Sequence, residues 1–113
     1  MHEMSLMESV LEIVEEEARK AGATKVKAVR LDIGELSHVE PEAMRFCFDA
    51  VVRGTIAAEA ALEIVRVPGQ GWCMDCCETV ALSERFGACP KCGNHRVQMT
   101  SGDDMRVAEL EVE

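Results

Sequence analysis

The sequence predicts a two-layer α/β domain of about three strands and two helices, with a zinc-ribbon-like knuckle inserted before the last strand. Two segments repeat apolar residues at helical spacing, three alternate them as strands do, and two C-x-x-C pairs precede the last strand. A chain of 113 residues is long enough for one modest domain and such a knuckle. We therefore expect residues 1–68 plus 99–113 to form the α/β domain and residues 69–98 to form the knuckle.

The first helix is expected from about Leu6 to Lys20, because apolar residues recur there at helical intervals. Ser5 and Glu8 have the spacing of a capping box, which places the helix start at Ser5 and leaves residues 1–4 outside it. Gly22 then ends the helix.

The remaining elements follow in order along the chain. Residues 25–33 alternate in polarity and predict a strand. Pro41 suits the first position of a second helix, which Gly54 ends. Residues 62–67 predict a second strand and residues 105–112 a third, with the helices on one face of the resulting sheet.

The knuckle carries the strongest chemical signal, which is a zinc site formed by four cysteines. A C-x-x-C turn brings two sulfurs to one ion, and two such turns complete the tetrahedron that Zn(II) prefers. Twelve residues separate the two pairs, enough for the chain to return, and Pro90 and Gly93 favour a tight second turn. The predicted zinc ligands are Cys73, Cys76, Cys89 and Cys92.

A closed shell of four cysteines favours a structural role over catalysis, because it leaves no position for a reactive water. Redox chemistry at the pairs is the weaker alternative, and the spacing alone leaves rubredoxin-like iron open. Cys77 would break the two-residue spacing and is expected to be a bystander. Cys47 is expected to be a small core residue of the second helix. Gly69 and Gly71 would permit motion of the knuckle.

Composition excludes several classes of partner. The formal charge is −9, and residues 71–98 carry equal numbers of acidic and basic side chains, so no basic stripe for nucleic acid is present. No apolar run is long enough for a membrane span, and the first residues do not resemble a secretory signal. Cysteine pairs without an export signal predict a cytoplasmic protein.

The amino terminus offers a second metal site. The terminal amine of Met1, the amide and imidazole of His2 and the amide of Glu3 can form fused chelate rings around a square-planar ion such as Ni(II) or Cu(II). A histidine near a terminus is more often solvated or a weak adventitious ligand, so the residues alone give this site only limited support.

Three motifs in this order resemble the HypA/HybF family of nickel metallochaperones for [NiFe]-hydrogenase maturation: MHEMSL, IGELSHVEPEAMRFCFDA and CxxC…CPxCG. The resemblance spans essentially the whole chain. It implies Ni(II) as transferable cargo held by Met1, His2 and Glu3, and a structural Zn(II) held by the four cysteines. His38 and His95 are weaker candidates for further nickel ligands.

The resemblance also implies the protein's partners. These are the GTPase HypB, the [NiFe]-hydrogenase large-subunit precursor and, in some organisms, urease maturation proteins. A homodimer is left open by the sequence. The competing interpretation is a zinc-ribbon adaptor between proteins that carries no nickel. An enzyme is not expected, because the sequence has no nucleophile constellation, phosphate-binding loop or open metal shell.

Overall fold

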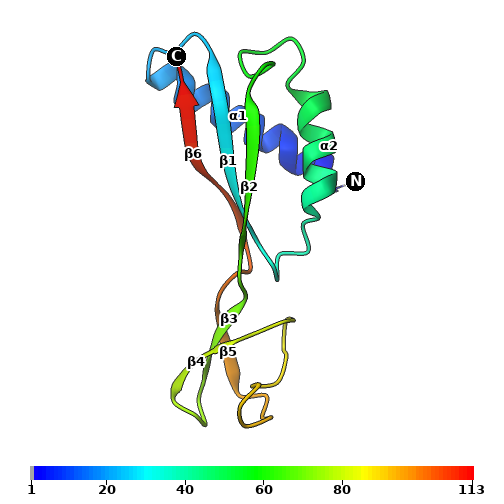
Figure 1. The fold of residues 1–113 in the computed structure, drawn as a ribbon, viewed down its shortest axis with the longest axis vertical. Coiled ribbons are helices and arrows are strands. Elements are labelled where there is room, and N and C mark those ends of the chain that lie inside the picture. Colours follow the sequence, from blue (N-terminus) through cyan, green and yellow to red (C-terminus); the bar gives the residue numbers. More distant parts are fainter. Residues whose placement is uncertain (1) are drawn as a thin grey trace. The chain divides into compact units, whose positions relative to one another are not determined.

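The computed structural model describes residues 2–113, which form two compact units (Figure 1). One unit comprises the residues up to Asp32 together with Glu40–Val65 and Arg106–Glu113. The other comprises Ile33–Val39 and Arg66–Met105, and it contains all four predicted zinc ligands. The predicted nickel ligand Met1 lies outside the described residues. No helix within residues 2–113 is both long and apolar enough to cross a bilayer.

The first unit is a three-stranded sheet with two helices. Its elements are α1 (His2–Lys20), β1 (Val26–Gly34), α2 (Pro41–Val51), β2 (Ala61–Val67) and β6 (Met105–Val112). The strand order is β2-β1-β6, so β1 is central and β6 is an edge. Helix α1 crosses behind the strands and contacts α2 (Figure 1). The predicted mixed α/β fold of three strands and two helices is confirmed.

Ion pairs join β1 to β6 in an antiparallel sense. Lys27 lies opposite Glu111 and Arg30 opposite Glu109, so residue numbers rise on one strand as they fall on the other. Nearer the start of β6, Arg106 Nη2 lies 3.4 Å from Oδ2 of Asp32 on β1. Asp32 is the one buried charged residue among residues 2–113. Strand β6 is therefore fixed to the sheet on its inner side.

The core of this unit comes from the apolar periodicity of the sequence. The buried residues of α1 are spaced three or four apart, as one helix face requires. They are complemented by alternating residues of β1 and by the inner face of α2, where Cys47 is fully buried as predicted. The core residues that these three elements contribute to the unit are Met7, Val10, Val14, Ala18, Val29, Leu31, Met44, Cys47 and Phe48.

The predicted start of the first helix is wrong, because α1 already begins at His2. Ser5 lies inside the helix, and its side chain caps nothing among residues 2–113. Residues 2–4 contain no glycine or proline to stop the helix, and an acidic Glu3 in the first turn is favoured by the helix dipole. The capping-box spacing of Ser5 and Glu8 therefore has no structural counterpart.

The second unit contains a sheet that the sequence pattern did not predict. Strands β4 (Glu78–Ala81) and β5 (Val97–Ser101) pair antiparallel with β3 (Gln70–Cys73), in the order β4-β3-β5. Each strand has four or five residues, which is too short for alternation to be recognised. These strands make the knuckle a small folded unit.

Two glycines in this unit lie where other backbone and side-chain atoms pack closely against the chain. A Cβ at Gly69 would lie 2.4 Å from the carbonyl oxygen of Leu82, and one at Gly71 would lie 2.5 Å from Val97 Cγ1. Both distances are sterically forbidden. The two glycines that were expected to permit motion thus occupy positions that leave no room for a side chain.

The loop between β1 and α2 belongs to the second unit. Its Leu36 N–H donates to Gly102 at 2.7 Å, and its Leu36 carbonyl accepts from Arg85 Nε at 2.8 Å. The domains expected from the sequence, residues 1–68 plus 99–113 and residues 69–98, place this loop in the α/β domain. That those two domains fold independently stays a prediction.

Candidate metal centre

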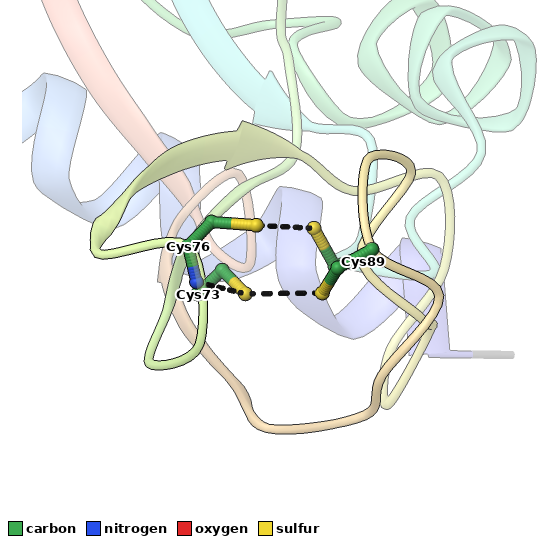
Figure 2. Close-up of side chains that lie close together, drawn as sticks. Cys73, Cys76 and Cys89 are labelled. Atoms are coloured by element: carbon green, nitrogen blue, oxygen red, sulfur yellow. Dashed lines mark hydrogen bonds between the residues drawn. The ribbon is translucent and has the colours of Figure 1, made fainter.

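Four cysteines from two turns converge in the second unit. Cys73 ends β3, Cys76 lies in the turn to β4, and Cys89 and Cys92 lie in the long loop before β5. All four sulfurs lie within 4.8 Å of one another. Figure 2 shows Cys76 and Cys89 pointing toward each other from the two turns. The structure therefore brings together the four residues that the spacing singled out.

The distances between the sulfurs match a tetrahedral metal site. Zinc–sulfur bonds of about 2.3 Å place the corners of a tetrahedron about 3.8 Å apart. Cys73 Sγ lies 3.7 Å from Cys92 Sγ, and Cys76 Sγ lies 3.9 Å from Cys89 Sγ. A disulfide would need about 2.05 Å. The donor set fits one thiolate-preferring ion.

The two turns have the same backbone design. The N–H of Cys77 donates to the Cys73 carbonyl at 2.8 Å, and the N–H of Gly93 donates to the Cys89 carbonyl at 2.8 Å. Both closing residues have positive φ, 54° at Cys77 and 76° at Gly93. A left-handed residue is needed at this point to close each turn, and glycine adopts that conformation without strain.

Backbone amides in both turns point at sulfurs. Cys76 N–H donates to Cys73 Sγ at 3.3 Å, and Lys91 N–H donates to Cys89 Sγ at 3.4 Å. Such bonds stabilise thiolates over thiols. Cys77 is exposed, its Sγ donates to the Met74 carbonyl at 3.5 Å, and it does not belong to the cluster.

The thiols ionise unequally in the absence of a cation. The backbone N–H of Cys92 is the main cause that lowers the pKa of Cys89 to about 7. Hydrogen bonds that the Cys76 thiol donates to the sulfurs of Cys92 and Cys73 raise the pKa of Cys76 to about 12. Four thiolates at this spacing repel one another, so full ionisation of the cluster requires a bound cation.

Polar contacts outside the cluster connect the two turns. Asp75 of the first turn accepts from Asn94 Nδ2 at 3.1 Å and from Arg96 Nη1 at 2.9 Å, beyond the second turn. Lys91 of the second turn pairs with Glu78 of β4. The sequence pattern did not identify these pairs, although opposite charges flank both turns.

The predicted nickel ligands His2 and Glu3 lie in the first turn of α1. The His2 side chain is 59% exposed, whereas that of Glu3 is only 12% exposed. Glu3 Oε2 lies 3.2 Å from His2 Nε2. The carboxylate therefore neighbours one imidazole nitrogen and leaves Nδ1 available.

The two weaker histidine candidates lie in the second unit. His38 is exposed in the loop before α2 and has a positive φ of 62°. His95 is exposed, and its Nδ1 lies 3.3 Å from the carbonyl oxygen of Phe86. Neither histidine belongs to the cysteine cluster.

Comparison with known proteins identifies the family. The family described as "Hydrogenase/urease nickel incorporation, metallochaperone, hypA" matches residues 1–112. A hydrogenase maturation factor HypA from Rhizobium leguminosarum bv. viciae is 65% identical over 112 residues, which is 99% of each chain. The factor of the same name from Dechloromonas aromatica (strain RCB) is 61% identical over 113 residues and all of both chains.

Solved structures agree with this assignment. The solution structure of the Ni metallochaperone HypA from Helicobacter pylori matches with a TM-score of 0.70 at 29% identity, covering 97% of this chain and 96% of that chain. A second solution structure, of a HypA protein, has a TM-score of 0.74 at 30% identity and covers 100% of this chain and 97% of that chain.

The match extends over almost the whole chain. The family is described by nickel incorporation and metallochaperone function, so the prediction that the chain is not an enzyme is confirmed through its family. The chain belongs to the HypA family of nickel metallochaperones for hydrogenase maturation.

Proposed function

We propose that this chain binds Ni(II) at its N-terminus and delivers it for assembly of the [NiFe]-hydrogenase active site, while its four cysteines hold a structural Zn(II). The nickel ligands would be Met1, His2 and Glu3. The HypA family and the name of its Helicobacter pylori member support nickel as the cargo.

The observation that carries this proposal is the arrangement of His2 and Glu3. His2 presents an exposed imidazole, and Glu3 lies against its Nε2 at 3.2 Å. A ligand nitrogen is commonly oriented by a carboxylate on the other ring nitrogen. The remaining Nδ1 is the nitrogen that closes a six-membered chelate ring with the residue's own amide.

The position of these residues in α1 also suits chelation by backbone amides. The first four N–H groups of a helix have no acceptor within the helix. Since α1 begins at His2, deprotonating the amides of His2 and Glu3 would break no helical hydrogen bond. A planar set of nitrogens is the arrangement that Ni(II) accepts and Zn(II) disfavours.

The cysteine cluster is proposed as the resident zinc site, because its four thiols match the ion in number, softness and spacing. Zinc there would supply folding energy to a unit in which the buried cluster at the site consists of Cys73, Val80 and Cys89. Cargo that is to be released would be held elsewhere, at the exposed terminus.

We further propose a cytoplasmic location and three partners, which are the GTPase HypB, the [NiFe]-hydrogenase large-subunit precursor and, as a second client route, urease maturation proteins. Relatives that are named hydrogenase maturation factors support the hydrogenase route. The family description also includes urease.

The test is a nickel titration of the zinc-loaded protein with an authentic, tag-free Met1, followed by calorimetry and absorbance. We expect one tightly bound Ni(II), lost in His2→Ala with zinc content unchanged. His38→Ala and His95→Ala serve as matched histidine controls. Equal binding by wild type and His2→Ala would reject terminal coordination and favour the zinc-ribbon adaptor.

The nickel affinity should also depend on pH. Binding requires an unprotonated amine and imidazole and displaces amide protons, so affinity should weaken as the solution becomes more acidic. Calorimetric titrations at several pH values check this dependence. A constant affinity between neutral and mildly acidic pH would contradict terminal coordination.

A further inference from the structure

The groove between α1 and the edge strand β6 contains none of the proposed nickel or zinc ligands among residues 2–113. It has a volume of about 430 Å³ and lies entirely within the first unit. Ile13 and Glu17 line it from the helix, and Val107, Leu110 and Val112 line it from the strand. Ile13 is 48% exposed, although it belongs to the apolar positions of α1.

The backbone of β6 is open on the same side. Only β1 pairs with β6 among residues 2–113. Glu113 directs both its peptide groups toward the start of β1, through bonds of 2.9 and 3.0 Å with Lys25 and Thr24. Peptide groups alternate in direction along an antiparallel ladder, so those of Leu110 and Val112 face the free edge.

The opposite edge of the sheet is different. There, Arg45 of α2 donates from Nη1 to the Leu62 carbonyl of β2 at 3.2 Å. A side chain thus occupies a backbone acceptor that an added strand would need. The free edge of β6 is therefore the better place on this sheet for another strand.

The acidic side chains along β6 favour a basic partner strand. Glu109 and Glu111 are 71% and 66% exposed, and each has a basic partner on β1, which is Arg30 or Lys27. On the outer side of β6, no residue within the described part of the chain provides a second basic neighbour. Across the groove, α1 contributes Glu17, whose carboxylate lies 3.7 Å from Lys20 Nζ.

We propose that the outer edge of β6 and its groove bind an extended peptide segment in which apolar and basic residues alternate. The segment adds a fourth strand to the sheet through the outward peptide groups of Leu110 and Val112. Its apolar side chains contact Ile13 and Leu110, and its basic side chains lie beside Glu109 and Glu111. This proposal does not depend on where nickel binds.

A second copy of the chain is a poorer occupant. Pairing two β6 strands on the same face would bring the acidic residues of both copies together, and each chain carries a formal charge of −9. Glu109 and Glu111 would repel the same residues of a second copy and attract the basic side chains of a peptide strand. The same two residues therefore disfavour self-pairing and favour a basic partner.

The experiment uses the zinc-loaded full chain and a fluorescent eight-residue peptide that alternates valine with lysine, the length matching β6. The control peptide alternates valine with glutamate. Anisotropy at low ionic strength measures binding, and amide chemical shifts locate it. We expect binding of the basic peptide only, with shifts concentrated at residues 107–112.

Three variants test the groove, each first shown by its amide spectrum to be folded. Glu109→Gln combined with Glu111→Gln should weaken binding about fivefold, from the loss of two cross-strand charge pairs. Ile13→Ser, at a half-exposed position, should weaken it by about the same factor through lost apolar contact. Glu42→Gln, at an 82% exposed glutamate of α2, should change it by less than about twofold.

Several results would overturn the proposal. These are no binding of the basic peptide, equal binding of the acidic peptide, shifts confined to residues outside β6 and α1, or equal affinities for all variants. Concentration-dependent self-association with shifts in β6 would show that a second copy, rather than a basic segment, occupies the edge.

Discussion

At the scale of single residues, the cysteine cluster shows how backbone geometry differentiates chemically identical groups. Cys89 receives N–H donors from its own turn, whereas Cys76 mainly meets other sulfurs. Donors favour the thiolate of Cys89, and neighbouring thiols favour the protonated form of Cys76. The four cysteines are therefore equivalent in sequence spacing but not in acidity.

Asp32 is a second residue whose surroundings decide its role. Its side chain is 11% exposed and accepts from Arg30 Nε at 3.2 Å and from Arg106 Nη2 at 3.4 Å. Asp32→Asn should lower the free energy of unfolding by about 1–2 kcal/mol, because two part-buried charge-assisted bonds weaken. Urea unfolding of the zinc-loaded protein measures this change. The exposed Glu111→Gln serves as the control and should cost less than about 0.5 kcal/mol.

At the scale of elements, the start of α1 shows that packing along the whole helix outweighs a local capping pattern. Local spacing suggested a cap at Ser5, but the helix continues to His2. The buried positions Met7, Val10 and Val14 anchor the helix by packing, and packing contributes more to a helix than one cap does.

The corrected helix start leads to a mutational prediction. Ser5→Ala should change the free energy of unfolding by less than about 0.5 kcal/mol, whereas loss of a true N-cap costs about 1 kcal/mol. Met7→Ala, at a fully buried position of the same helix, should cost about 2–5 kcal/mol. Thermal unfolding followed by circular dichroism compares the three proteins. If Ser5→Ala lost about 1 kcal/mol or more of unfolding free energy, Ser5 would act as an N-cap after all, and the helix start at His2 would be contradicted.

At the scale of the whole molecule, the two units differ in what holds them together. The first has an apolar core from two helices and a sheet. The second has short strands around a few buried residues and the four cysteines. A small unit with so little core depends on a metal or similar cross-link for stability.

Metal removal should therefore affect the units unequally. After chelation, amide resonances of residues 66–105 should collapse toward unfolded values, while those of α1 and α2 remain dispersed. Two-dimensional amide spectra before and after chelation test this, and restored zinc is the control. Loss of both sets together would show that the units fold as one, contrary to the expected domains 1–68 plus 99–113 and 69–98.

The sequence by itself determined the elements with clear periodicity and the cysteine cluster, whose members have a fixed spacing. The helix at Pro41, the strands before and after it and the four-cysteine pattern depend on local rules, because helix faces, alternation and C-x-x-C turns are encoded within short segments. The family resemblance followed from motifs spread along the whole chain, and it is confirmed.

Only the tertiary structure decided the features that need distant partners. Strands β3 to β5 are too short to be recognised alone and exist because each pairs with another. Gly69 and Gly71 suggested flexibility in sequence, yet close packing explains them in space. The extension of α1 to His2, the contact of Glu3 with the imidazole and the open edge of β6 likewise depend on packing and pairing, which no local pattern encodes.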